Sequence, residues 1–248
     1  MARYAELKGR PQEPPPQLSV DQPAAAAILA RHAGRHAYLP QVDALALLAA
    51  YGLPVPAHAA IGSRGDLAAA AKQVGFPCVL KVDSPEIVHK SDAGGVALGI
   101  ADAAALEAAF AKMANRFAGS QAAYLLMAEQ AAGREIIVGA KAAPGLGNLL
   151  LFGLGGIFVE VMKDIAVGVA PLSRPEARAL IRSIKGYPLL AGIRGQAGVD
   201  LAALEELLLR ASRLVADFPQ ISEMDLNPVF LYPRGTAPAV VDVRLRMQ

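Results

Sequence analysis

The sequence predicts an α/β (α+β) fold with two lobes that clasp a cleft, on three observations. A strand, a polar loop, a second strand and an alanine-rich helix follow one another over residues 78–117 and would form a small lobe. Short apolar runs separated by glycine turns then occupy residues 124–161, which is typical of an antiparallel sheet. No glycine- or serine-rich linker separates these halves, so we expect tightly joined lobes with a site in the cleft between them.

Capping residues and glycine stops delimit the expected elements, as Asp66, Asp102 and Gly75 illustrate. We expect a flexible proline-rich tail over residues 1–20, a first lobe over 21–122 and a second lobe over 123–248. The first lobe would contain helices at 24–32, 42–51 and 66–74, strands at 78–82 and 96–100, and a helix at 102–117. The second lobe would contain strands at 124–129, 134–141, 149–152 and 157–161, helices at 175–184 and 201–218, and strands at 221–226 and 239–243.

The composition is that of a globular chain with little charge bias. The 248 residues are 54% hydrophobic, and 24 basic against 22 acidic residues give a net charge of +2. That excess is too small to neutralise the phosphates of a nucleic acid, so any anion site must be local. The single cysteine, Cys78, lies in an apolar run and indicates a small core residue in a reducing environment. Because the N-terminus also lacks the apolar segment of a signal peptide, we expect a cytoplasmic protein.

The segment from Lys81 to Gly95 contains several charged and potentially reactive side chains. Lys81 belongs to an apolar strand, where an unpaired charge would be costly to bury, so it requires an anion. His89, Lys90 and Ser91 follow on a loop that two glycines close. A histidine beside cations on such a loop indicates phosphate handling, although a solvated loop histidine is the plain alternative.

Two familiar nucleotide motifs are missing from this sequence. It contains no Gly-Lys-Ser or Gly-Lys-Thr, and Phe158 stands where a dinucleotide fingerprint needs its third glycine. A bound nucleotide would therefore be held by strand-borne lysines, glycine-loop amides and acidic metal ligands. Gly155 and Gly156 are candidates for a phosphate-facing turn, because glycines let backbone N–H groups approach an anion. A hairpin whose glycines only provide positive φ is the alternative.

The C-terminal strand carries a second polar pattern. Glu223, Asp225 and Asn227 alternate with apolar residues, so all three side chains would share one face, and a later strand brings Asp242. Mg²⁺ prefers hard oxygen ligands, and one or two carboxylates with an amide and nucleotide phosphates would suffice. A solvated polar strand face would show the same alternation.

Several segments, in order along the chain, resemble the ATP-grasp beta subunit of ADP-forming acyl-CoA synthetases. They are residues 47–56, 75–96, 152–164, 187–195 and 222–228, and the likeness extends over about residues 36–246. The last of them also resembles the beta subunit of succinyl-CoA synthetase. The resemblance implies an ATP-grasp fold that binds ATP or ADP with Mg²⁺. One departure is Gly168, where some relatives carry a basic residue.

The resemblance also implies roles for particular residues. His89 would be the catalytic residue that carries the phosphoryl group. Asn227 and Asp242 would be the metal ligands, with Asp225 and Glu223 in or near the same shell. The nucleotide would contact a larger set, which includes the backbone of a hinge strand against adenine: Lys81, Lys90, Ser91, Met127, Ala128, Glu129, Glu135, Gly155, Gly156 and Arg194. Edge-strand charges that only aid solubility are the alternative for Glu129 and Glu135.

The implied reaction is acyl-CoA + ADP + phosphate ⇌ carboxylic acid + CoA + ATP. The sequence has no glycine-rich CoA-binding segment, so a CoA-binding alpha subunit would supply that half. Met1 and the tail favour a separate subunit over part of a fused enzyme. The alternatives are a succinyl-CoA synthetase-like subunit, another ATP-grasp ligase, and a non-catalytic nucleotide-sensing subunit. The histidine argues against the sensor, since sensing needs no phosphoryl acceptor.

Overall fold

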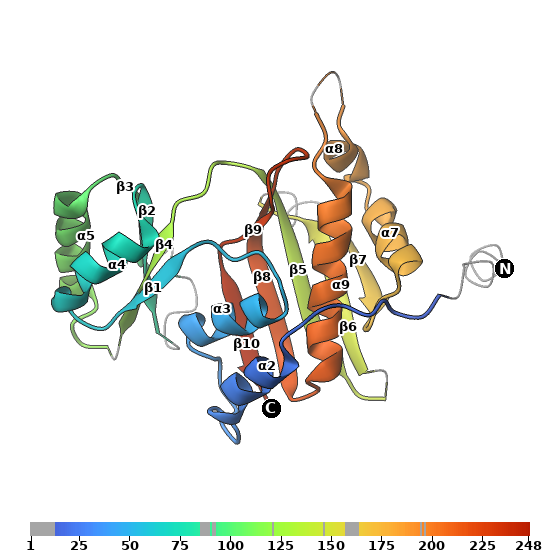
Figure 1. The fold of residues 1–248 in the computed structure, drawn as a ribbon, viewed down its shortest axis with the longest axis horizontal. Helices are drawn as coiled ribbons and strands as arrows, with labels where there is room; N and C mark the ends of the chain where they lie inside the picture. The colour runs from blue at the N-terminus through green and yellow to red at the C-terminus, as the bar shows by residue number, and fades with distance from the viewer. Residues whose placement is uncertain are drawn as a thin grey trace.

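The computed structural model describes residues 13–84, 90, 93–120, 122–145, 147–156, 164–193, 195 and 197–248. Two antiparallel sheets organise these residues into a small and a large lobe, which lie side by side in Figure 1. The predicted α+β class with two lobes therefore agrees with the structure. No helix in the described ranges combines the length and the apolar character needed to cross a membrane.

The small lobe is a four-stranded sheet with two helices packed against it. Its strands follow the order β1 (His58–Ile61), β4 (Ala123–Ala128), β2 (Cys78–Asp83) and β3 (Val96–Ile100). Helices α4 (Leu67–Val74) and α5 (Ala103–Arg116) cover the sheet (Figure 1). Alternate residues of β2, among them Leu80 and Val82, enter this core, where the rings of Phe110 and Tyr124 meet edge to face at 5.1 Å.

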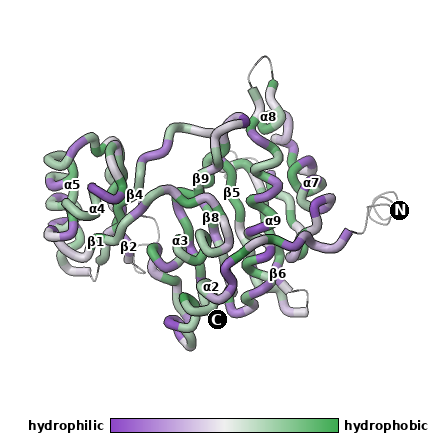
Figure 2. The backbone as a smooth tube through the Cα atoms, in the orientation of Figure 1, coloured by the Kyte–Doolittle hydropathy of each residue, from purple (hydrophilic) through white to green (hydrophobic). Residues whose placement is uncertain are grey.

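The large lobe is a six-stranded antiparallel sheet with its helices on one face. The strand order is β10 (Val243–Met247), β8 (Ile221–Leu231), β5 (Arg134–Ala143), β6 (Gly147–Leu154) and β7 (Ile165–Val169), and β9 (Ala239–Val240) also pairs with β8. Helices α7 (Arg174–Ser183) and α9 (Leu201–Asp217) cover it, and the short α8 (Tyr187–Ala191) lies between them in sequence. In Figure 2, apolar segments of α9 lie over apolar strands, as expected for a helix with one buried face.

Two helices that precede the small lobe in sequence belong to the large core. The buried side chains of α2 (Gln22–Ala30) and α3 (Gln41–Ala50) join the same hydrophobic cluster as α9 and β8, and α3 contacts β10. The first residue of α3 thereby lies at the junction of the lobes. Because this packing crosses the expected boundary at residue 122, we propose that the small lobe comprises only residues 58–128.

Three expectations about strands need correction. β4 was expected to open the second lobe, but it pairs along its whole length with β2 in the small sheet. The strand expected at 239–243 is interrupted, so that Asp242 lies in the link between β9 and β10 rather than inside a strand. β8 continues to Leu231, past the predicted end at Leu226. Apolar character alone does not determine which sheet a strand joins or where it bends.

Smaller differences concern short elements and one cap. The pattern did not predict β7 or α8, which are only five residues long each. The carboxylate of Asp66 does not cap α4 as expected, but accepts hydrogen bonds from the backbone N–H groups of Gly62 and Ser63. The strand expected at 157–161 lies outside the described residues.

Candidate functional site

A cavity of about 360 Å³ opens where the two lobes meet. Helix α3, strand β2 and strand β10 all contribute to its walls, so the cavity draws on both sheets. Polar and charged side chains line much of it: His32, Arg35, Tyr38, Gln41, Asp83, Ser84, Lys90 and Arg244. Of the site residues that the sequence predicted, Lys90 lines this cavity, whereas Lys81, Asn227 and Asp242 are not among its lining residues.

Lys81 crosses from the small sheet to the large lobe. Its side chain is 8% exposed, and Nζ donates a hydrogen bond to the backbone carbonyl of Val241. Burial lowers the pKa of Lys81, and the nearby charge of Lys90 lowers it further, whereas Asp242 opposes both effects. The charge of Asp242 thus favours the protonated form of Lys81, while the hydrogen-bond partner of its ammonium group is the Val241 carbonyl.

Lys90 and Asp242 form an ion pair across the same boundary. The distance from Lys90 Nζ to Asp242 Oδ1 is 3.4 Å, and the two side chains are 9% and 21% exposed. Gln41 joins both of them: its Oε1 accepts from Lys90 Nζ at 2.8 Å, and its Nε2 donates to Asp242 Oδ1. Two lysines and one carboxylate therefore meet in a largely buried polar cluster.

Asp83 extends this cluster at the end of β2. Its Oδ2 accepts the backbone N–H of Gln41 at 2.8 Å. Burial raises the pKa of the Asp83 carboxyl, and the hydrogen bond from Gln41 and the charge of Lys90 oppose that rise. Neither Asp83 nor Gln41 stands out in the sequence, because nothing local distinguishes a buried polar side chain at the end of a strand or the start of a helix from a surface one.

The polar face of β8 is present as predicted. Met224 and Leu226 are buried, whereas Asp225, which lies between them, and Asn227, which follows Leu226, are exposed. The backbone N–H of Asn227 donates to the carbonyl of Asp242 at 3.3 Å, which brings these two residues together.

The acids of β8 differ in their surroundings. Glu223 accepts from the Tyr38 hydroxyl at 3.3 Å and pairs with Lys141 at 3.8 Å, so its charge is compensated at the sheet surface. Although Asp225 as a whole residue is exposed, partial desolvation of its carboxyl raises its pKa, and the charge of Arg244 partly offsets the rise. The negative charges of Asp242 and Glu223 add to the rise.

The protein side chains at this site could supply only part of the coordination shell of a divalent cation. No three His, Cys, Asp or Glu side chains of the described chain gather closely enough to hold a metal ion by themselves. Asn227 and Asp242 offer an amide and a carboxylate, and Mg²⁺ commonly binds through one or two carboxylates together with substrate phosphates and water. The residues present fit a magnesium ion that arrives with a nucleotide.

The residues predicted to contact adenine, Met127 to Glu129, lie at the end of β4 in the small sheet and just after it. Met127 is 1% exposed, and the backbone N–H groups of Ala128 and Glu129 donate to the carbonyls of Ala57 and Pro77 at 2.8 and 3.1 Å. The carboxylate of Glu129 accepts the N–H of Gly99 at 3.1 and 3.2 Å. Its side chain therefore serves the small sheet, and the backbone N–H groups of Ala128 and Glu129 already have partners in that lobe.

The glycine pair lies beside Glu135, which the sequence also singled out. The N–H of Gly155 donates to the Glu135 carbonyl at 2.8 Å, so this amide is already used. A Cβ at position 155 would lie 2.9 Å from Glu135 Cβ, which explains the glycine by close packing. Gly156 has φ of 62°, the left-handed conformation that glycine adopts without strain.

Three predicted site residues lie outside the described residues: His89, Ser91 and Arg194. The segment from 157 to 163, which belongs to one of the family phrases, lies outside them too.

Comparison with known proteins gives this site a context. The sequence profile of the ATP-grasp domain matches residues 30–247. The beta subunit of acetate–CoA ligase (ADP-forming) II from Pyrococcus furiosus is 38% identical over 83% of this chain and 89% of that subunit. The 4-hydroxybutyrate–CoA ligase (ADP-forming) of Nitrosopumilus maritimus is 40% identical over 80% of this chain. This chain covers only 29% of that longer enzyme.

A solved structure matches as well. It is the dinucleotide-forming acetyl-coenzyme A synthetase 1 of Ca. Korarchaeum cryptofilum in complex with coenzyme A and Mg-AMPPCP, whose phosphohistidine segment points towards the nucleotide binding site. The TM-score is 0.79 at 34% identity, over 90% of this chain and all of the matched one (100%).

Proposed function

The chain belongs to the ATP-grasp family, and to the ADP-forming acetate–CoA ligases within it, and from this premise we propose that it is the nucleotide-binding subunit of an ADP-forming acyl-CoA synthetase. The observation that carries the proposal is the cluster of Lys81, Lys90 and Asp242, which joins both lobes at the cleft. Two lysines suit the phosphates of a nucleotide, and the carboxylate suits its metal ion.

In this proposal the nucleotide lies between the sheets, with its base at the hinge and its phosphates at the polar cluster. The backbone of Met127–Glu129 would contact adenine, and Gly156 would face the phosphates. Lys81 and Lys90 would contact the phosphate oxygens as compact charges. Glu135, Ser91 and Arg194 remain proposed contacts of the nucleotide.

Asn227 and Asp242 would hold Mg²⁺, with Asp225 beside them. The ion would neutralise charge on the phosphate oxygens during phosphoryl transfer. Glu223 is the weaker candidate, because Tyr38 and Lys141 already compensate its charge.

His89 would carry the phosphoryl group. The partner forms the acyl phosphate and takes up its phosphoryl group on a histidine of its own; a neutral imidazole nitrogen of His89 then attacks that phosphorus, so that a new N–P bond forms and the N–P bond to the partner breaks. An oxygen of the ADP β-phosphate then attacks the phosphohistidine: the N–P bond breaks, an O–P bond forms, and ATP and histidine result. Imidazole has a pKa of about 6.5, so a large neutral fraction exists near pH 7. The Korarchaeum enzyme supports this step, since it has a phosphohistidine segment that points towards its nucleotide binding site.

The acyl-phosphate half of the reaction would lie in a CoA-binding partner. The chain covers 29% and 30% of two longer relatives, but 89% and 90% of two beta subunits, so the remainder exists either as a fused segment or as a separate chain in these enzymes. We propose that this chain likewise supplies the nucleotide-binding part, and that a CoA-binding partner supplies the rest of the enzyme. The lone buried Cys78 favours a reducing compartment, so we place the reaction in the cytoplasm.

Titration calorimetry of the isolated chain tests the nucleotide site. We expect ADP to bind with Mg²⁺, and Asp242→Asn to weaken that binding at least about tenfold, because the ion loses a charged ligand. Asp217→Asn is the matched control. Asp217, the last residue of α9, accepts from the Tyr51 hydroxyl at the end of α3 and from Arg213 on α9, away from the cleft. No binding heat from the wild type at millimolar Mg-ADP would contradict the proposal.

A further inference from the structure

We propose that Gln41 is a positioning residue of the magnesium–nucleotide site, holding the Asp242 carboxylate and the Lys90 ammonium in one arrangement across the cleft. This inference rests on the proposed function and extends it to a residue that neither the sequence motifs nor the comparisons single out.

Gln41 is the first residue of α3 and is 2% exposed. Its backbone N–H donates to Asp83 Oδ2 at 2.8 Å, its Oε1 accepts from Lys90 Nζ at 2.8 Å, and its Nε2 donates to Asp242 Oδ1. The three partners come from β2, from the segment that follows it, and from the link between β9 and β10. One side chain therefore connects both lobes.

The chemistry of the partners fixes the orientation of the amide. A protonated lysine can only donate, so the group that faces Lys90 must be the carbonyl oxygen. An ionised carboxylate can only accept, so the group that faces Asp242 must be the NH₂. A flipped amide would set two donors against each other and two acceptors against each other. Gln41 is thus selective for a cation on one side and an anion on the other.

This arrangement determines which oxygen of Asp242 is available. Oδ1 accepts from Gln41 and lies 3.4 Å from Lys90 Nζ, whereas Oδ2 has no donor among the residues that the structure describes. A carboxylate held through one oxygen presents the other in a fixed direction. Groups that orient a metal ligand in this way typically change metal affinity by about 10- to 100-fold when they are removed.

A purely structural role for Gln41 would have a different signature. Helix α3 is anchored on the large core by Leu45, Leu47 and Leu48, all completely buried, and these contacts do not involve the amide. If the amide were only structural, its removal would lower stability and change ADP affinity equally with and without Mg²⁺. If the amide positions Asp242, its removal would reduce the gain in ADP affinity that Mg²⁺ gives.

The test compares ADP affinity of the full chain, by calorimetry, in the presence and absence of Mg²⁺. Gln41→Met keeps the length of the side chain and removes both polar groups. Gln41→Asn keeps the polar groups but is one methylene shorter, so it cannot reach both partners, and it guards against misfolding of the first variant. We expect both variants to reduce the Mg²⁺ enhancement of ADP affinity by about 10- to 100-fold, with ADP alone changed less than about threefold.

Asn148→Leu is the matched control. Asn148 is also a buried amide, 6% exposed, whose Nδ2 donates to the carbonyl of Val215 at 2.7 Å on the helical side of the large sheet. This variant should lower the melting temperature and leave the Mg²⁺ enhancement unchanged. If wild-type protein shows a Mg²⁺ enhancement and both Gln41 variants retain it within about twofold, the inference is wrong. If the wild type binds no Mg-ADP at all, the proposed function itself fails.

Discussion

Cys78 shows how burial decides the chemistry of a single residue. Its thiol has no exposed surface in β2, and burial, with a contribution from the charge of Glu129, raises its pKa to about 11. Because the thiolate is the reactive species, the native residue should behave as a small core side chain.

We therefore expect Cys78 to resist thiol reagents in the folded protein. At pH 8 a pKa of about 11 leaves roughly one thiol in a thousand ionised, and the reagent must also reach a buried atom. Reaction with a chromogenic disulfide should be at least about 100-fold slower than in denaturant, where one thiol per chain should react. Rapid modification of the native protein would show that β2 is open to solvent.

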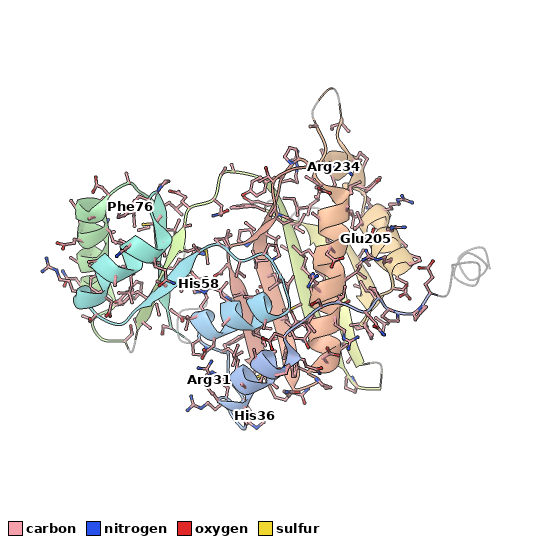
Figure 3. All side chains as sticks on the ribbon, viewed as in Figure 1. Arg31, His36, His58, Phe76, Glu205 and Arg234 are labelled. Carbon is pink, nitrogen blue, oxygen red and sulfur yellow. The ribbon has the colours of Figure 1, made fainter. Side chains whose placement is uncertain are left out.

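At the scale of elements, one carboxylate joins α7 to α9. Glu205 is 6% exposed and accepts from Arg174 at 2.9 Å and from Arg178 at 2.6 Å. In Figure 3, Glu205 lies on α9 beside α7. Burial alone would raise the pKa of Glu205, but the hydrogen bonds and charges of the two arginines outweigh it and lower the pKa.

We expect Glu205→Gln to lower the free energy of unfolding by about 1–2 kcal/mol at pH 7. Losing one partner of a fully buried pair costs about 3–5 kcal/mol, and the arginines here are 43% and 56% exposed, which screens the interaction. Chemical denaturation of both proteins measures the difference.

The pH dependence of that difference follows from the sign of the shift. A carboxyl with a lowered folded pKa stabilises the protein above its unfolded pKa of about 4.3, and loses this effect as the pH falls through the lower folded value. The gap between wild type and Glu205→Gln should therefore shrink below about pH 4. Glu206→Gln, at a 34% exposed position, should cost less than about 0.5 kcal/mol and is the control. A gap that stays constant from pH 7 to pH 3 would assign the loss to packing instead.

At the scale of the whole molecule, the site needs both lobes and the proposed enzyme needs a second half. The cluster of Lys81, Lys90 and Asp242 exists only because α3 and the large sheet meet the small sheet. This chain would thus bind nucleotide alone but turn over acyl-CoA only with its CoA-binding partner.

Phosphate labelling of the assembled complex tests the transfer through His89. With acetyl-CoA and labelled phosphate, we expect the label on this chain, in an adduct that is labile to acid and stable to base, as a phosphoramidate should be. His89→Ala should abolish both the label and ATP formation while nucleotide binding stays within about threefold. His36→Ala is the control, because His36 is an exposed histidine on a different segment (Figure 3). Full turnover by the His89 variant would rule out the relay.

The sequence by itself determined the local secondary structure of several segments. Periodicity, caps and glycine stops predicted α5, α7 and α9 closely, since those signals act over a few neighbouring residues. The alternation in β8 placed Asp225 and Asn227 on one face correctly for the same reason. The resemblance to the family implied roles for particular residues, including Lys81 and Asp242.

Only the tertiary structure decided how distant segments combine. The membership of β4 in the small sheet, the packing of α3 on the large core and the break before β10 depend on partners far along the chain. Gln41 is the clearest example: it lies 49 residues from Lys90 and 201 from Asp242. Burial and hydrogen bonding give this amide its role, and both are properties of the assembled fold rather than of the residues around it in the sequence.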